Sequence, residues 1–169
     1  MRILGVDPGS IATGWGLIEG SVSRPVLVDC GVLKASRAGD PLATRLARLG
    51  SDLEALLPRL HPDVAAVETP FHGASARSAL ALAHARGVIL AVLAGAGLEV
   101  AEYSPAAVKK AVTGNGRAGK EQVASMVGRL LAADMRRPSR DLSDALAVAL
   151  CHQAGAGFHT AVGERTSDR

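Results

Sequence analysis

The chain has 169 residues, of which 48% are hydrophobic and 21% charged, and it carries a formal net charge of +3. This length suffices for one domain with a full hydrophobic core, and the composition excludes a disordered chain. A charge at Asp7 comes too early for a signal peptide, and no apolar run approaches the ~20 residues that cross a bilayer, so we expect a soluble, cytoplasmic protein with no membrane partner.

The first part of the chain predicts a β-meander of three strands, at residues 2–7, 12–19 and 25–34. The first strand ends at the turn Asp7-Pro8-Gly9. Gly14 and Gly16 interrupt the second strand, which weakens it without an evident structural gain. We interpret their missing side chains as room for a bulky ligand and its metals beside the first strand.

Helices and strands then alternate along the chain. Leucines at helical spacing predict a helix from Pro41 to about Leu57, with Asp40 as its N-cap. The apolar residues 64–67 predict a buried parallel strand that ends at Glu68. The remaining predicted elements are a helix at 75–94, a strand at 98–103, helices that begin at Ser104-Pro105 and near Lys120, and a last helix at 141–153.

This order of elements predicts an α/β fold with one mixed sheet flanked by helices. We place the folded domain at residues 1–154 and a disordered tail at 155–169, because the tail lacks apolar periodicity. Asp7 and Glu68 both follow apolar strands at their carboxyl ends, where open α/β sheets bind ligands.

Four acidic residues are the candidate catalytic and metal-binding residues: Asp7, Glu68, Asp141 and Asp144. Gathered at one point they would repel one another unless divalent cations neutralised them, and they match the ligands of two-metal phosphodiester hydrolysis. Hard oxygen ligands favour Mg²⁺ or Mn²⁺ over zinc. Because these four carboxylates carry four negative charges, the rest of the chain carries a net +7, which favours a phosphate-rich partner.

Each carboxylate also has a structural interpretation that the sequence leaves open. Asp7 could be an ordinary turn aspartate. Asp141 as an N-cap with Asp144 three residues later resembles a capping box, and capping is compatible with metal binding at a helix N-terminus. Glu68 has no cationic neighbour in the sequence, so it needs a basic partner or a metal ion.

Basic and aromatic residues accompany the acidic ones. The segment 114–120 matches most of a Walker A loop, but Glu121 stands where a hydroxyl residue should hold Mg²⁺, so we expect no nucleotide cofactor. We expect Lys120 to meet a phosphate at a helix start, with a solvent-exposed lysine as the alternative. At most one of the adjacent Lys109 and Lys110 should face the site. Phe71 could stack on an unpaired base or pack under its own loop.

Together these motifs resemble the RuvC family of bacterial Holliday-junction resolvases. The resemblance covers residues 2–153 and is carried by Asp7-Pro-Gly with Thr13-Gly-Trp-Gly, Glu68 with Phe71, Lys109, Lys120, and Asp141-Leu-Ser-Asp144. It implies a ribonuclease H-like fold, a mixed five-stranded sheet with helices on both faces, and a crossover junction endodeoxyribonuclease of DNA recombination and repair. It also implies a catalytic Lys120, DNA contacts by Phe71, Lys109, Lys120 and Arg117, and two metal ions per active site when DNA is bound.

The resemblance further implies partners. These are a homodimer that nicks two opposed strands of a four-way junction, and the branch-migration complex RuvAB. An isologous dimer suits such a substrate because it presents identical sites to equivalent strands. The Ala- and Leu-rich helix at 75–94 is our candidate for the dimer face, with burial against its own sheet as the alternative. Thr69 and His72 stand where the family often has Gln and a second aromatic residue.

Two other classes of protein compete with this interpretation. An actin-like ATPase or sugar kinase also opens with an aspartate-glycine hairpin, but it needs two such lobes and this chain has room for one. A junction-binding protein without catalysis would gain affinity by losing the four carboxylates, so their presence argues against it.

Overall fold

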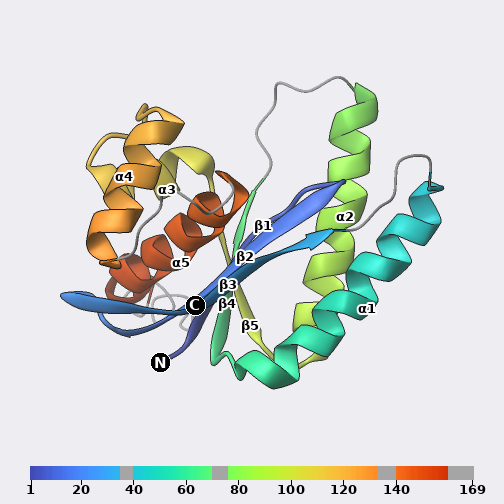
Figure 1. Ribbon diagram of the computed structural model, residues 1–169, viewed down its shortest axis with the longest axis horizontal. Helices are drawn as coiled ribbons and strands as arrows, with labels where there is room; N and C mark the ends of the chain where they lie inside the picture. Colours follow the sequence, from blue (N-terminus) through green and yellow to red (C-terminus); the bar gives the residue numbers. More distant parts are fainter. Residues whose placement is uncertain (35–39, 70–75, 133–139, 160–169) are drawn as a thin grey trace, which may run out of the picture.

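The computed structural model describes the chain except for residues 35–39, 70–75, 133–139 and 160–169 (Figure 1). The strands are β1 (Ile3–Asp7), β2 (Ala12–Ser21), β3 (Arg24–Lys34), β4 (Val64–Glu68) and β5 (Glu99–Tyr103). The helices are α1 (Leu42–Leu60), α2 (Ala76–Gly95), α3 (Pro105–Thr113), α4 (Lys120–Leu130) and α5 (Arg140–His159). The elements follow the predicted order, with boundaries that mostly differ by one to three residues.

The strands form one mixed sheet in the order β3-β2-β1-β4-β5. β2 is antiparallel to both β1 and β3, whereas β4 is parallel to both β1 and β5. Helices α1 and α2 cover one face of the sheet, and α3, α4 and α5 cover the other (Figure 1). The predicted five-stranded mixed sheet with helices on both faces is therefore confirmed.

Alternation along β1 divides the core into two layers, because successive strand side chains point to opposite faces. Ile3 packs with α3, α4 and α5, while Leu4 and Val6 pack with α1 and α2. A Cβ atom on Gly5 would overlap the carbonyl oxygen of Ala145, and one on Gly16 would lie 2.5 Å from Leu146 Cδ2. These glycines therefore let α5 lie directly on β1 and β2. The interpretation of Gly16 as room for a ligand is wrong.

The structure tests the N-terminal caps that the sequence predicts for its helices. Pro41 occupies the N-cap position of α1 with no side-chain cap bond, so the prediction of Asp40 as the cap is wrong. Ser104 caps α3 as predicted, because its hydroxyl oxygen accepts a hydrogen bond from Ala107 N–H at 3.2 Å. Helix α5 is described from Arg140, which places Asp141 in its first turn, and capping by Asp141 stays a prediction because its side chain lies outside the described residues.

At its other end α5 continues to His159, six residues beyond the predicted end at Gln153. It therefore extends past residue 154, where the sequence suggested that the domain stops. A tail without fixed structure stays a prediction, because residues 160–169 lie outside the described part of the chain.

Among the described helices, α2 is long and apolar enough, by length and composition alone, to span a membrane. The expectation that no apolar run reaches that length is therefore wrong. However, its stripe of Ala85, Ile89 and Leu93 is buried in the core on the sheet. Arg86 also forms an ion pair with Glu102 of β5. These contacts make α2 a layer of the α/β fold.

Candidate active site

Carboxylates from three elements line one cavity of about 180 Å³. Asp7 ends β1 and Glu68 ends β4, and these adjacent parallel strands carry both side chains to the same edge of the sheet. Asp144, near the start of α5, reaches the cavity from the helical layer above the sheet. The structure thus places three of the four predicted acidic residues on the walls of the same cavity.

The remaining predicted residues of the site cannot be placed in the same way. Asp141 lies on α5 three positions before Asp144, on the same side of the helix, but its side chain is outside the described part of the structure. Phe71 and His72 also lie outside the described residues. Roles for Asp141 and Phe71 therefore stay predictions.

Glu68 lies in an environment that disfavours its ionised form. Burial raises its pKa above the usual range, and the nearby Asp144 carboxylate raises the pKa further. A hydrogen bond with Asp7 and the charges of Lys120 and Lys109 lower the pKa, but these effects are smaller. Positive charge from the protein therefore does not offset the cost of ionising Glu68, and an added cation would favour its ionised form.

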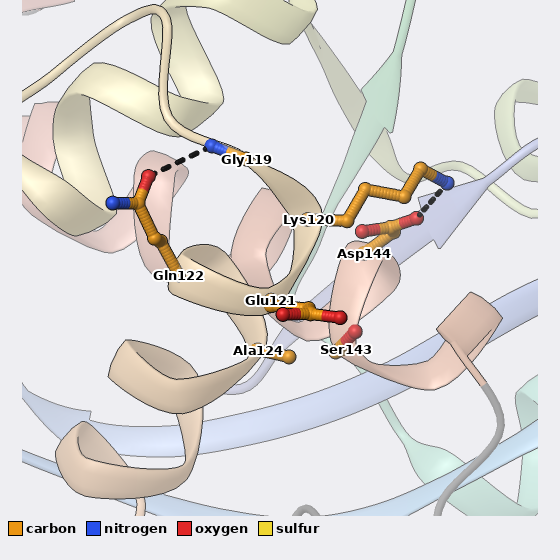
Figure 2. Close-up of a pocket in the computed structure, with 7 residues that line it drawn as sticks. All are labelled: Gly119, Lys120, Glu121, Gln122, Ala124, Ser143 and Asp144. Carbon is orange, nitrogen blue, oxygen red and sulfur yellow. Dashed lines mark hydrogen bonds and ion pairs between the residues drawn. The ribbon is translucent and has the colours of Figure 1, made fainter.

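Two lysines reach the same cavity from the α3–α4 region. Lys120 Nζ donates a hydrogen bond to Asp144 Oδ2 at 3.0 Å, as Figure 2 shows. Lys109, on α3, also lines the cavity, whereas its neighbour Lys110 is not among the lining residues. This agrees with the prediction that at most one of the pair faces the site. Arg117 is exposed in the α3–α4 connection, outside the cavity lining.

The glycine-rich segment before Lys120 connects two helices. Gly114 ends α3 in the left-handed region (φ 77°), a conformation that glycine adopts without a steric cost. Gly119 is the N-cap of α4, and its N–H donates to Gln122 Oε1 at 2.9 Å (Figure 2). A Walker A loop follows a strand, but this segment follows a helix. The segment ends at the N-cap of α4, so that Lys120 is the first residue of the helix and its side chain reaches Asp144.

A second cavity, of about 410 Å³, adjoins the first and shares Lys120 and Asp144 with it. Its other walls are the first turns of α4 and Ser143 of α5, as Figure 2 shows. The Lys120–Asp144 ion pair therefore contributes to the walls of both cavities.

The donor chemistry of the first cavity fits a hard divalent cation. Its titratable lining residues are carboxylates and lysines, and the described lining contains neither histidine nor cysteine. Within the described residues, however, no group of three His, Cys, Asp or Glu side chains lies close enough to hold one ion. Lys120 donates to Oδ2 of Asp144, and a carboxylate has a second oxygen that can bind a cation, so the ion pair and a metal ion are compatible.

Comparison with known proteins gives a consistent result. The family model described as crossover junction endodeoxyribonuclease RuvC matches residues 3–152. A RuvC of Anaeromyxobacter sp. (strain K) is 48% identical over 159 residues, which cover 94% of this chain and 83% of the relative. A RuvC of Chloroflexus aurantiacus is 47% identical over 153 residues, which cover 90% of this chain and 92% of the relative.

Solved structures agree with the sequence matches. Thermus thermophilus RuvC superposes with a TM-score of 0.83 at 34% identity, over 95% of this chain and 98% of that one. The T. thermophilus RuvC in complex with Holliday junction substrate gives a TM-score of 0.84 at 30% identity with the same coverage. The yeast mitochondrial Holliday junction resolvase Ydc2, at 13% identity and a TM-score of 0.71, shares the fold.

The fold and the site together define a metal-dependent nuclease with a ribonuclease H-like fold. Within that class, the chain belongs to the RuvC family of crossover junction endodeoxyribonucleases.

Sequence reasoning missed the residues that set the distance between α5 and the sheet. Ala145 and Ala149 of α5 face Gly5 of β1 at close range. Their spacing of four places them on one side of the helix, as close packing on a glycine requires. Small residues at this spacing were the available signal, but their partner lies about 140 positions away in the sequence and only the fold identifies it.

Proposed function

We propose that this chain is a homodimeric endonuclease that resolves four-way DNA junctions by hydrolysing one phosphodiester bond in each of two opposed strands. The observation that carries this proposal is the convergence of Asp7, Glu68 and Asp144 with two lysines around one cavity. The relatives bear the name crossover junction endodeoxyribonuclease, and the T. thermophilus protein was solved with a Holliday junction substrate. The activity would serve recombination and DNA repair in the cytoplasm, with the branch-migration complex RuvAB as a partner.

The carboxylates are the proposed ligands of two Mg²⁺ ions when DNA is bound, with Mn²⁺ as a substitute. The proposed ligand set is Asp7, Glu68, Asp141 and Asp144. Such ions, when bound, activate the attacking water and stabilise the leaving oxygen. The buried Glu68 carboxyl supports this assignment, because burial first and the Asp144 carboxylate second raise its pKa, and the two lysines do not offset them.

Lys120 is the proposed phosphate contact at the cleavage site. Its side chain is 69% exposed while that of Asp144 is 19% exposed, so the lysine can move toward a bound strand while Asp144 stays in place. Lys109 would contact the strand from α3, and Arg117 and Phe71 would contact DNA outside the cavity. No step requires a histidine base.

Lys120→Ala is expected to slow junction cleavage by about 100-fold, because a cation positioned on developing negative charge contributes on that scale. The junction dissociation constant should rise far less, since Lys120 is one of many basic residues. Single-turnover cleavage in Mg²⁺ and gel-shift binding in Ca²⁺ measure the two effects separately. Lys110→Ala, one position from Lys109 but outside the cavity lining, is the control. Equal losses of cleavage and binding in Lys120→Ala would reduce Lys120 to a general phosphate contact.

Helix α2 is the proposed dimer face. Only Ala85, Ile89 and Leu93 of its residues are buried, so one stripe packs on the sheet and most of this apolar helix is exposed. Burial in the chain's own core, the alternative interpretation of this helix, is confirmed for that stripe, and the dimer face is proposed for the exposed side. The exposed side holds Leu80 and several alanines. Exposed apolar residues of this kind are typical of a protein–protein interface, and a twofold dimer would pair identical helices.

Leu80→Glu is expected to weaken the dimer by about 100-fold or more, because an unpaired charge buried in an interface costs several kcal/mol. Leu80 is 61% exposed in the single chain, so the fold itself should tolerate the change. Sedimentation velocity over a concentration series measures the association. Val22→Glu, at a similarly exposed position (63%) in the β2–β3 turn, should leave association unchanged. A Leu80→Glu protein that associates as tightly as the wild type would exclude α2 from the interface.

The experiment that tests the proposed function uses a synthetic four-way junction and a linear duplex of the same sequence, each with Mg²⁺. We expect paired nicks at symmetric positions in two opposed strands of the junction and no cleavage of the duplex. Equal cleavage of both substrates would contradict junction selectivity. Detectable ATP affinity by calorimetry would instead favour an actin-like ATPase.

A further inference from the structure

A buried threonine holds the turn that carries Asp7. Thr13, in β2, is fully buried at 0% exposure. Its hydroxyl oxygen accepts a hydrogen bond from Gly9 N–H at 3.3 Å and donates one to the Gly9 carbonyl oxygen at 3.2 Å. One side chain therefore contacts both main-chain polar groups of the residue two positions after Asp7.

Three further features constrain the main chain of the turn between Asp7 and Thr13. A Cβ atom on Gly9 would overlap the carbonyl oxygen of Ala12, so the two ends of the turn touch there. Pro8 fixes its own φ and has no N–H to donate. Outside the turn, the Arg45 guanidinium of α1 donates to the Ser10 carbonyl oxygen. The turn is therefore held at Gly9 by Thr13 and at Ser10 by Arg45.

We propose that Thr13 is a positioning residue for cleavage: its hydroxyl fixes the Gly9 main chain and thereby holds the Asp7 carboxylate in the active-site cavity. This inference rests on the proposed function, because it assumes that Asp7 binds the catalytic metals. Asp7 is the last residue of β1 and pairs with Gly14, the residue after Thr13. The Thr13 hydroxyl therefore acts just beyond the end of the β1–β2 ladder, on the turn residues 8–11, which belong to no strand.

The proposed role of Thr13 depends on its hydroxyl group and not on the volume of its side chain. Valine has the shape of threonine but cannot bond to Gly9, so it would leave the Gly9 N–H and carbonyl without this partner. The turn would then relax toward other partners, and a shift of about 1 Å in a catalytic group can cost about 100-fold in rate. If packing alone explained Thr13, valine would serve as well.

The test compares Thr13→Val with Thr13→Ser, which keeps the hydroxyl, and with Thr44→Val on the exposed surface of α1. We expect Thr13→Val to slow single-turnover junction cleavage by about 10- to 100-fold and to raise the Mg²⁺ concentration for half-maximal rate. The junction dissociation constant should stay within about twofold. Thr13→Ser should recover most of the rate, and Thr44→Val should match the wild type.

A second measurement separates this inference from the proposed function. Mn²⁺ affinity of the DNA-free protein, followed by electron paramagnetic resonance, should fall in Thr13→Val and recover in Thr13→Ser. If the wild type does not cut junctions, the proposed function fails, while the Mn²⁺ affinities still decide the role of Thr13. The inference is overturned if Thr13→Val cleaves and binds Mn²⁺ like the wild type. It is also overturned if Thr13→Ser loses as much as Thr13→Val. Should Thr13→Val not fold, Thr13→Ala takes its place in both comparisons.

Discussion

Replacing Asp7 with asparagine is expected to abolish junction cleavage while leaving junction binding intact. The amide keeps the size of the side chain but removes its negative charge and one ligand oxygen, and it also changes the hydrogen bond that Asp7 shares with Glu68. Loss of a single essential catalytic group commonly lowers a rate by 10³-fold or more, so we expect a decrease of at least about 10³-fold. Binding should hold or tighten slightly, because the substitution removes a negative charge that faces a polyanion.

The measurement for Asp7→Asn is single-turnover cleavage of a four-way junction with each strand labelled in turn, in Mg²⁺ and in Mn²⁺. Gel shifts in Ca²⁺ give the junction dissociation constant. Asp52→Asn, the same change at an exposed position of α1, is the matched control and should cleave normally. Normal cleavage by Asp7→Asn would show that the carboxylates around this cavity are not the hydrolytic centre.

Gly5→Ala is expected to destabilise the fold and to impair cleavage together. The new Cβ would overlap the Ala145 carbonyl oxygen and press on the Ala149 main chain, so α5 must move away from β1. Forcing extra atoms into a packed core commonly costs about 1–3 kcal/mol of the free energy of unfolding. Asp144 lies one position before Ala145, so the same movement would carry it away from Asp7 and Glu68. We expect cleavage to slow by about 100-fold.

Urea unfolding measures the stability loss, and cleavage assayed well below the unfolding midpoint measures the catalytic loss in folded protein. Gly155→Ala is the control on the same helix, because a Cβ atom there meets nothing within 4 Å. An alanine in a helix should be neutral or stabilise by up to ~1 kcal/mol. A Gly5→Ala protein as stable and active as the wild type would mean that the contact between β1 and α5 is looser than described.

Some of the site could be predicted because it depends on local pattern. Asp7 and Glu68 each end a short apolar strand, and β4 is apolar up to Glu68, as a parallel strand covered on both faces should be. Ser104 before Pro105 identified the start of α3 from two adjacent residues. Asp40 failed as a cap because capping depends on the main-chain path into the helix, which composition does not specify.

Other features depended on residues that are far apart in the chain. Lys120 and Asp144 are 24 positions apart, and their ion pair follows from the packing of α4 against α5. Gly16 was interpreted as room for a ligand because a missing side chain does not say which neighbour approaches it. In the fold that neighbour is Leu146 of α5.

The sequence by itself determined the elements, the acidic residues at the two strand ends, and the basic segment before α4. These depend on periodicity, turn chemistry and charge, which act over a few residues. Only the tertiary structure decided that α5 lies on Gly5, that Asp144 meets Lys120, and that Thr13 holds the turn after Asp7. The physical reason is that close packing and hydrogen bonds select partners by position in space, and positions in space are set by all the elements together.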